Sequence, residues 1–154
     1  MNQEALIHPT AIVHESARLG ADVRIGAYSV IERDAAIGEG CRIGPHVVIH
    51  SRVELGPRCA VHAGAVLGDV PQDFAFQDVP SGVRIGADCT LREGVTVHRG
   101  TKENTLTTTG DGCYLMANSH LAHNVTLGNR VIMANGSLLG GYVTVGDGVF
   151  ISGN

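Results

Sequence analysis

The chain has 154 residues, and its 11 Lys and Arg against 15 Asp and Glu give a formal net charge of −4 at pH 7. This acidity argues against a nucleic-acid-binding protein, which usually presents a basic face. Hydrophobic residues make up 44% of the chain and aromatic residues only 4%, so we expect an aliphatic core. No apolar run reaches the roughly 20 residues that span a membrane. The N-terminal segment has no basic region followed by an apolar stretch, so we expect a cytoplasmic protein without a secretory signal.

A six-residue repeat begins at Ile7 and runs through most of the chain. Each repeat has a large aliphatic residue, and the residue two positions earlier is Ala, Val, Ser or Cys. Residues two apart on a strand share a face, so both are expected to point inward from very short strands. The large positions are Ile7, Val13, Leu19, Ile25, Ile31, Ile37, Ile43, Ile49, Leu55, Val61, Leu67, Ile85, Leu91, Val97, Leu115, Leu121, Leu127, Met133, Leu139, Val145 and Ile151.

Strands this short bury a face only when they stack, each coil hydrogen-bonding to the next at ~4.8 Å. The pattern resembles the hexapeptide-repeat family of left-handed parallel β-helices. The resemblance implies an all-β solenoid over residues 1–154, with three hexapeptides in each triangular coil, so that every third repeat stacks. The left-handed sense rests on the resemblance alone, because parallel crossovers are generally right-handed.

All four cysteines fall in the small inward column of the repeat. They are Cys41, Cys59, Cys89 and Cys113. A buried free cysteine packs as a small hydrophobe, so we expect four buried thiols. The chain has no C-x-x-C pair of the kind that binds zinc, and a disulfide is not expected in a cytoplasmic protein.

The repeat is interrupted twice, and it resumes in phase both times. The first interruption, about residues 69–82, contains Phe74 and Phe76, and the second, about residues 100–111, is polar and rich in threonine. We expect two loops projecting from the solenoid, where binding residues tend to be carried. Tolerated insertions are the alternative. The two aromatic side chains indicate that the first loop packs against another surface.

Three histidines are expected to lie close together on the outer surface. His120 precedes the inward Leu121, His123 follows it at the corner of a coil, and His98 starts the second loop on a neighbouring coil. Neutral imidazoles can bind zinc, or one imidazole can act as a general base near neutral pH. A plain surface role is the third interpretation. A covalent acyl-enzyme is disfavoured because the cysteines point inward.

Five segments carry a more specific resemblance: IHPTAIV, GDVPQDF, REGVTVHRGT, MANSHLAHNVTLGNRVIMAN and GDGVFISGN. Together they resemble the UDP-N-acetylglucosamine O-acyltransferase family of lipid A biosynthesis. The resemblance implies transfer of an (R)-3-hydroxyacyl group from acyl carrier protein to the 3-hydroxyl of UDP-N-acetylglucosamine, by direct attack and without a metal or cofactor. It also implies a homotrimer with active sites between neighbouring subunits.

The same resemblance implies a role for particular residues. His123 matches the general base, and Gly141 matches a glycine whose backbone N–H stabilises the oxyanion. The positions that the resemblance implies for substrate binding are Gln72, Asp73, His98, Asn118 and His120.

Three cleft positions depart from the family pattern. Ala75 stands where many members carry lysine, Asn124 where Asp is common, and Tyr142 where histidine is usual. These changes leave the sugar nucleotide open, and the acyl chain length is open as well.

The family continues through further coils into a C-terminal helical domain. We therefore expect a C-terminally truncated chain whose own activity is open, with Val149 and Ile151 exposed on the last coil because solenoids need a cap.

Other functions stay open at this point. A related N- or O-acyltransferase could act on another UDP-amino sugar, and a non-catalytic β-helix scaffold is a further possibility. A zinc enzyme of the γ-carbonic anhydrase type fits poorly, because that family uses an H-x4-H pair and this chain has H-x2-H.

Overall fold

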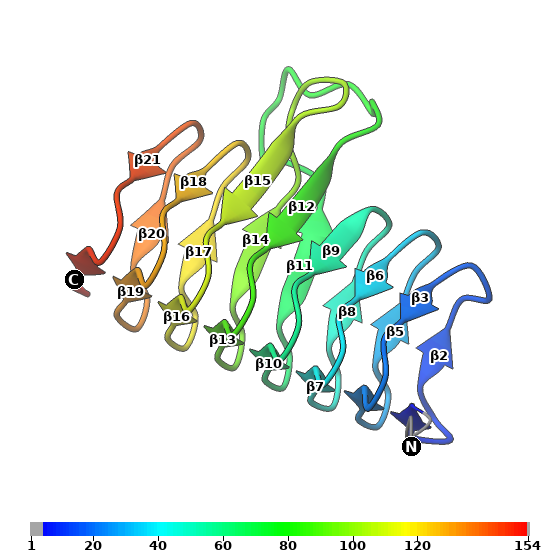
Figure 1. Ribbon diagram of the computed structural model, residues 1–154. Helices are drawn as coiled ribbons and strands as arrows, with labels where there is room; N and C mark the ends of the chain where they lie inside the picture. Colours follow the sequence, from blue (N-terminus) through cyan, green and yellow to red (C-terminus); the bar gives the residue numbers. More distant parts are fainter. Residues whose placement is uncertain (1–4, 154) are drawn as a thin grey trace.

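The computed structural model, which describes residues 5–153, is a left-handed parallel β-helix. The repeat predicted the stacked coils, and the family resemblance implied their left-handed sense. Short strands form three parallel sheets, here called A, B and C, one on each side of a three-sided prism (Figure 1). Sheet A contains β1 (Leu6–Ile7), β4 (Arg24–Ile25), β7 (Arg42–Ile43), β10 (Ala60–Val61), β13 (Thr90–Leu91), β16 (Tyr114–Leu115), β19 (Ile132–Met133) and β22 (Phe150–Ile151).

The other two sides have the same construction. Sheet B contains β2 (Ile12–Val13), β5 (Val30–Ile31), β8 (Val48–Ile49), β11 (Val66–Asp69), β14 (Thr96–His98), β17 (His120–Leu121) and β20 (Leu138–Leu139). Sheet C contains β3 (Arg18–Leu19), β6 (Ala36–Ile37), β9 (Val53–Leu55), β12 (Gly82–Ile85), β15 (Leu106–Thr109), β18 (Thr126–Leu127) and β21 (Thr144–Val145). Within residues 5–153 we find no helix suited to crossing a membrane.

The pairing register confirms that every third repeat stacks. Ile7 pairs with Ile25, and the same spacing recurs from coil to coil. Where the first loop intervenes Val61 pairs with Leu91, and where the second intervenes Leu91 pairs with Leu115. The loops therefore lengthen two coils without shifting the inward column.

The core consists of the two inward columns. Buried residues include aliphatic side chains and all four cysteines, as predicted. Each thiol lies within hydrogen-bond distance of a carbonyl on the next coil; Cys41 Sγ, for example, is 3.1 Å from Gly56 O. The thiols therefore satisfy carbonyls in the core.

The second loop is shorter than expected. We predicted an excursion over about residues 100–111, but β15 (Leu106–Thr109) belongs to sheet C. The prediction was wrong because the inward positions of this strand are the buried Thr107 and Thr109, which an aliphatic pattern misses. Their hydroxyls are satisfied by backbone groups, since Thr107 Oγ1 accepts from Asn124 N–H at 2.8 Å.

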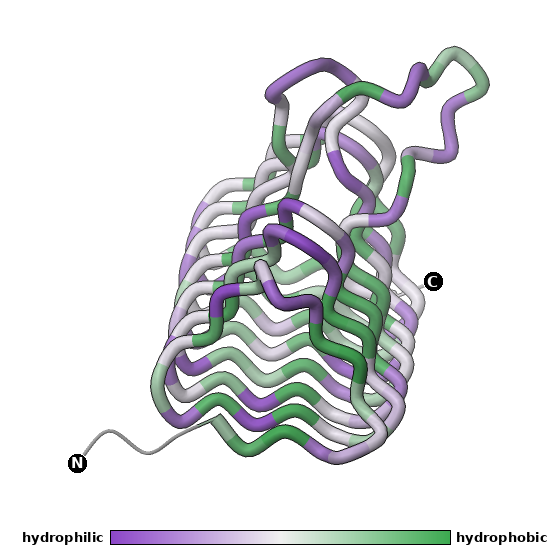
Figure 2. Tube along the Cα trace, turned by 90° about the vertical axis from the view of Figure 1, so that its right-hand side faces the viewer, coloured by the Kyte–Doolittle hydropathy of each residue, from purple (hydrophilic) through white to green (hydrophobic). Residues whose placement is uncertain are grey.

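Both loops project from the same edge of the prism (Figure 2).

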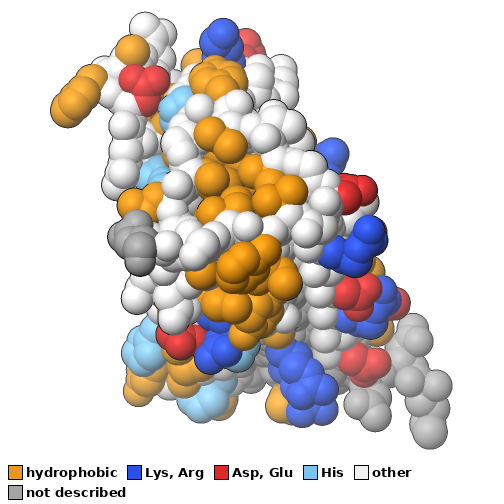
Figure 3. Space-filling model, turned by 90° about the vertical axis from the view of Figure 1, so that its left-hand side faces the viewer, with side chains coloured by type: hydrophobic (Ala, Val, Ile, Leu, Met, Phe, Trp, Pro, Cys, Tyr) orange, Lys and Arg blue, Asp and Glu red, His pale blue; other side chains and the backbone are white. Residues whose placement is uncertain are grey.

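Hydrophobic side chains gather on the face seen in Figure 3. On the last coils Leu138 is 68% exposed, Val149 40% and Phe150 60%. Val149 is therefore exposed as expected, whereas Ile151 is less exposed than expected, since it is half-buried.

A glycine at a tightly packed corner gives a sharp test of the stacking. A Cβ on Gly56 would lie 2.6 Å from the Gly86 carbonyl carbon, which is backbone and cannot move aside. Because overpacking strains the coils, we expect Gly56→Ala to lower the free energy of unfolding by about 3 kcal/mol in chemical denaturation. Gly140→Ala is the control, since a Cβ there meets nothing within 4 Å and the same position on the preceding coil is already an alanine, Ala122. Equal stability of the two variants would contradict the observed stacking.

Candidate functional site

One corner of the β-helix carries both loops and the residues that match a catalytic pair. This corner joins sheet B to sheet C. The first loop, residues 70–81, leaves it between β11 and β12, and the second, residues 99–105, leaves it between β14 and β15. On the next two coils the same corner holds His123 and then Gly141. Stacking therefore brings four separate segments together.

His98 and His120 lie on neighbouring strands of sheet B. Their ring centroids are 4.6 Å apart, with the rings at 77° to each other. His120 Nδ1 lies 2.7 Å from Thr96 Oγ1, which holds the ring against the strand below. The repeat places His98 outward, yet its side chain is only 7% exposed. A register shift after Leu67 sets Asp69 opposite His98, so the extended strands enclose it.

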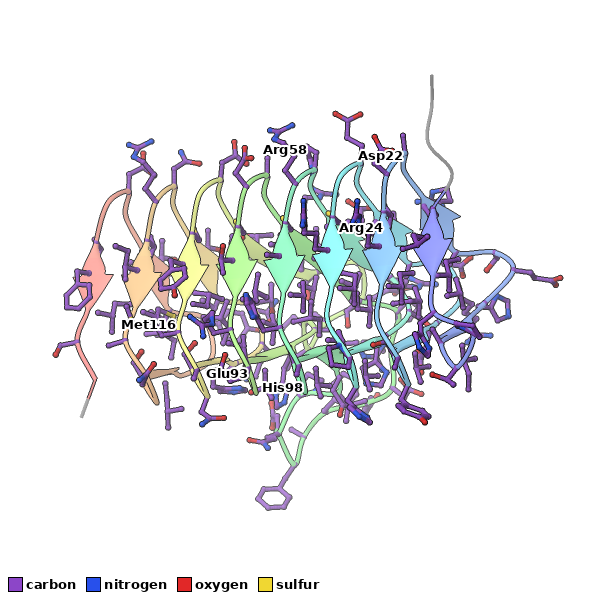
Figure 4. The ribbon with its side chains drawn as sticks, turned by 90° about the horizontal axis from the view of Figure 1, so that it is seen from below. Asp22, Arg24, Arg58, Glu93, His98 and Met116 are labelled. Carbon is purple, nitrogen blue, oxygen red and sulfur yellow. The ribbon has the colours of Figure 1, made fainter. Side chains whose placement is uncertain are left out.

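Burial lowers the pKa of both histidines. For His98 burial is the largest cause, followed by the neighbouring His120, while Asp69 acts in the opposite direction. For His120 burial again dominates. His98 Nδ1 has no hydrogen-bond partner among residues 5–153. A neutral imidazole with an unpaired nitrogen can bind a polar ligand group. Figure 4 shows that His98 lies on the side of the prism from which the loops project.

The lowered pKa values make stability depend on pH. In the folded state both groups have a pKa below the ordinary value of about 6.5, so at lower pH the unfolded chain binds more protons. We therefore expect full stability above that value and a falling free energy of unfolding as pH drops below it. Denaturation from pH 7.5 down to 5 should show a shallower fall for His98→Gln than for His14→Gln, a control on an exposed histidine. Parallel curves for the two variants would contradict this origin.

His123 lies at the corner itself, with its ring directly over Gly141. A Cβ on Gly141 would lie 2.3 Å from His123 Cε1 and 2.5 Å from Nε2, so only glycine leaves room for the ring. The Tyr142 ring meets the imidazole edge-on, with centroids 5.2 Å apart. Among the described residues, the Gly141 N–H makes no hydrogen bond to the backbone. An imidazole and an N–H that is free among the described residues thus lie close together.

The second loop is tied to this corner. Thr101 donates from its backbone N–H to Asn124 Oδ1 at 3.0 Å, and its hydroxyl donates to the same oxygen at 3.0 Å. That hydroxyl also lies 3.0 Å from the Tyr142 hydroxyl. Asn124 Oδ1 in turn lies 3.2 Å from His123 Nδ1.

The first loop is held at its base by Arg99. Its guanidinium donates to the Val79 carbonyl at 3.1 Å, pairs with Asp78, and lies 5.3 Å from the centre of the Phe76 ring. Phe74, by contrast, is fully exposed within this chain. A groove of about 530 Å³ at this base is lined by polar side chains, among them Arg99 and Asp69.

Within residues 5–153, the side chains of three of the expected substrate-binding residues make no hydrogen bond to the histidines. Gln72 and Asp73 are exposed on the first loop. Asp73 Oδ1 accepts from the Ala75 N–H at 2.9 Å, a contact that shapes the loop. Asn118 occupies the preceding corner, between sheets A and B, with a positive φ of 58°. The sequence pattern indicated no role for Thr101 or Arg99, because both lie in the second loop, outside the repeat.

No group of three or more His, Cys, Asp or Glu side chains within residues 5–153 is arranged to hold a metal ion. Two of the three histidines, His98 and His120, form a close ring pair. The third, His123, stands at the corner and contacts the side-chain amide of Asn124.

Comparison with known proteins finds repeat-containing transferases that are similar to this chain. The family described as "Bacterial transferase hexapeptide (six repeats)" matches residues 34–69 and 107–141. The acyl-(acyl-carrier-protein)–UDP-N-acetylglucosamine O-acyltransferase of Campylobacter concisus is 37% identical over 149 residues, 96% of this chain and 57% of that protein. The protein of the same name from Syntrophobacter fumaroxidans is 43% identical over 136 residues, 88% of this chain and 53% of that protein.

A solved structure agrees with these relatives. LpxA from Acinetobacter baumannii superposes with a TM-score of 0.94 at 37% identity, covering 97% of this chain and 58% of that one. The chain thus spans about half the length of the curated relatives that it matches.

Proposed function

Since this chain is homologous to the hexapeptide-repeat UDP-N-acetylglucosamine O-acyltransferases over about half of their length, we propose that it is the β-helical part of an enzyme of this activity. The enzyme transfers an (R)-3-hydroxyacyl group from acyl carrier protein to the 3-hydroxyl of UDP-N-acetylglucosamine, the first step of lipid A biosynthesis. The observation that carries the proposal is the imidazole of His123 seated over Gly141, beside a backbone N–H that is free in the described chain.

The proposed reaction needs one base and one oxyanion donor. The imidazole of His123 takes the proton from the sugar hydroxyl as that oxygen attacks the thioester carbonyl carbon. The carbonyl oxygen becomes an oxyanion, which the Gly141 N–H stabilises. When the carbon–sulfur bond breaks, the thiolate of the carrier protein leaves. The imidazolium then gives this thiolate the proton that it took from the sugar hydroxyl. No covalent enzyme intermediate, metal or cofactor enters this sequence.

The substrate-binding residues are proposed to come from two subunits. In one chain His98 and His120 form a ring pair on the sheet B strands that lead to the corner of His123. Gln72 and Asp73 are exposed on the first loop, Asn118 stands at the preceding corner, and Phe74 extends fully into solvent. A cytoplasmic homotrimer would let the first loop meet the cleft of a neighbouring subunit, which accounts for its exposed aromatic side chain.

The test is product formation by the protein that contains this chain. Acyl carrier protein thioesters of varied length and UDP-N-acetylglucosamine are supplied, and thiol release is followed together with the mass of the sugar nucleotide. We expect one acyl group per sugar, attached as an ester. Absence of thiol release with every donor would instead favour a non-catalytic scaffold.

A second candidate is a related N- or O-acyltransferase for another UDP-amino sugar. Ala75, Asn124 and Tyr142 favour it, because each replaces a charged or titratable group expected in the cleft. Supplying a UDP sugar with an amine at the 3-position separates the two candidates. An amide product formed faster than the ester would favour this second function.

A further inference from the structure

The side-chain amide of Asn124 is held in one orientation by the second loop. The backbone N–H of Thr101 can only donate a hydrogen bond, and it lies 3.0 Å from the atom assigned as Asn124 Oδ1. Flipping the amide would bring an NH2 group against this N–H, setting two donors against each other. The Thr101 hydroxyl, which bridges Asn124 Oδ1 and the Tyr142 hydroxyl at 3.0 Å each, adds a second contact on the same side.

The fixed amide determines which nitrogen of His123 carries the proton. The same Asn124 Oδ1 lies 3.2 Å from His123 Nδ1, and a carbonyl oxygen can only accept. A neutral imidazole facing it must therefore carry its proton on Nδ1, which leaves the lone pair on Nε2. In this ring position Nε2 lies 2.5 Å from the place that a Cβ on Gly141 would take, so the basic nitrogen is close to that residue.

We propose that Thr101 and Tyr142 are positioning residues that lock the Asn124 amide, so that neutral His123 is held as the Nδ1–H tautomer with Nε2 as its basic atom. The need for a lock arises from asparagine itself. A carboxylate at this position would accept through either oxygen and would need no orientation, whereas an amide has one accepting and one donating face. The lock is supplied by a residue of the second loop and a residue of the next coil.

The backbone at Asn124 and Tyr142 has the left-handed conformation that recurs at the turns of this chain. Asn124 and Tyr142 both have a positive φ, of 59° and 63°. Asparagine tolerates this region well, whereas a bulky residue such as tyrosine is uncommon in it. The groups that face the imidazole are the Asn124 amide, the Tyr142 ring and the Gly141 backbone, and His98 is near enough for its pKa to be lowered by His123.

The experiment measures the tautomer directly. Nitrogen-15 NMR of the histidine rings at pH 8, with no substrate present, assigns the protonated nitrogen of His123 in the natural chain and in Thr101→Val, Tyr142→Phe and the double variant. We expect Nδ1–H in the natural chain and a partial rise of the Nε2–H fraction in the variants, because the hydroxyl contacts are lost while the backbone N–H of Thr101 still reaches Asn124 Oδ1. Thr108→Val and Tyr114→Phe are matched controls, because Thr108 lies on the outside of sheet C and Tyr114 on sheet A.

The Asn124→Asp background separates a lock from a general structural effect. There the same two substitutions should leave the His123 tautomer unchanged, since a carboxylate has no donor face. An Nε2–H tautomer in the natural chain, or an equal response to the substitutions in both backgrounds, would overturn the proposal.

A kinetic readout links the tautomer to the proposed function, on which this consequence rests. The double variant should lower kcat about fivefold with little change in KM, which corresponds to one lost hydrogen bond of about 1 kcal/mol, and Asn124→Asp should restore kcat in the variant. Because the NMR result needs no turnover, it stands even if the transferase proposal fails. An altered tautomer with unchanged kcat would contradict the role of Nε2 as the base.

Discussion

Replacing His123 with glutamine is expected to lower kcat for acyl transfer about 10³-fold, within the range typical of a lost general base. Glutamine approximates the size and polarity of the imidazole, so substrate binding and stability should change little. It cannot accept the proton from the sugar hydroxyl, and the oxygen would attack as a neutral alcohol. Thiol release from acyl carrier protein thioesters, measured at saturating UDP-N-acetylglucosamine, gives the value.

The matched control is His14→Gln. His14 lies at the same sheet B to sheet C corner on an early coil and is exposed. Its replacement should leave kcat within twofold of the natural enzyme. A His123→Gln enzyme that retained more than a tenth of the natural kcat would rule out His123 as the base.

Replacing Gly141 with alanine is expected to lower kcat about 100-fold while the protein stays folded. The new Cβ would lie 2.3 Å from His123 Cε1, so the imidazole must turn aside. A displacement of about 1 Å in a catalytic group can cost a factor of about 100. The backbone itself is not strained, because Gly141 does not have a positive φ. Kinetics and a thermal melt of the same preparation separate the two effects.

Gly140→Ala is the control for this variant. Gly140 is the adjacent residue, and a Cβ there meets nothing within 4 Å. We expect its kcat and its Tm to match those of the natural protein. If the two alanine variants lose activity equally, the seat of the His123 ring over Gly141 has no part in catalysis.

The fold could be predicted because the inward side chains recur every six residues in the sequence. Each inward position is read from the chain without long-range information, and the pairing of Ile7 with Ile25 follows from counting three repeats. The method failed at β15, where Thr107 and Thr109 fill inward positions. A segment rich in threonine is polar, so its sequence resembles that of a loop. The β-branched side chain nevertheless suits a strand when backbone groups satisfy the hydroxyl.

The site could be predicted only as far as the stacking reaches. Counting coils places His120 near His98 and sets Gly141 one coil beyond His123, and the structure has both contacts. The position of Thr101 could not be counted, because it lies on a loop outside the repeat. Its contacts depend on how residues 99–105 turn back to the corner, and side-chain hydrogen bonds there decide that path.

The proposed acyl transfer depends most directly on proton transfer to His123. The rate of acyl transfer should be measured between about pH 5 and 8, the range in which histidines commonly titrate, and the His123 ring should be followed by NMR in the same protein. We predict that the rate falls as pH is lowered and that its midpoint coincides with protonation of His123. A rate that stayed constant while NMR showed this ring gaining its proton would contradict the account.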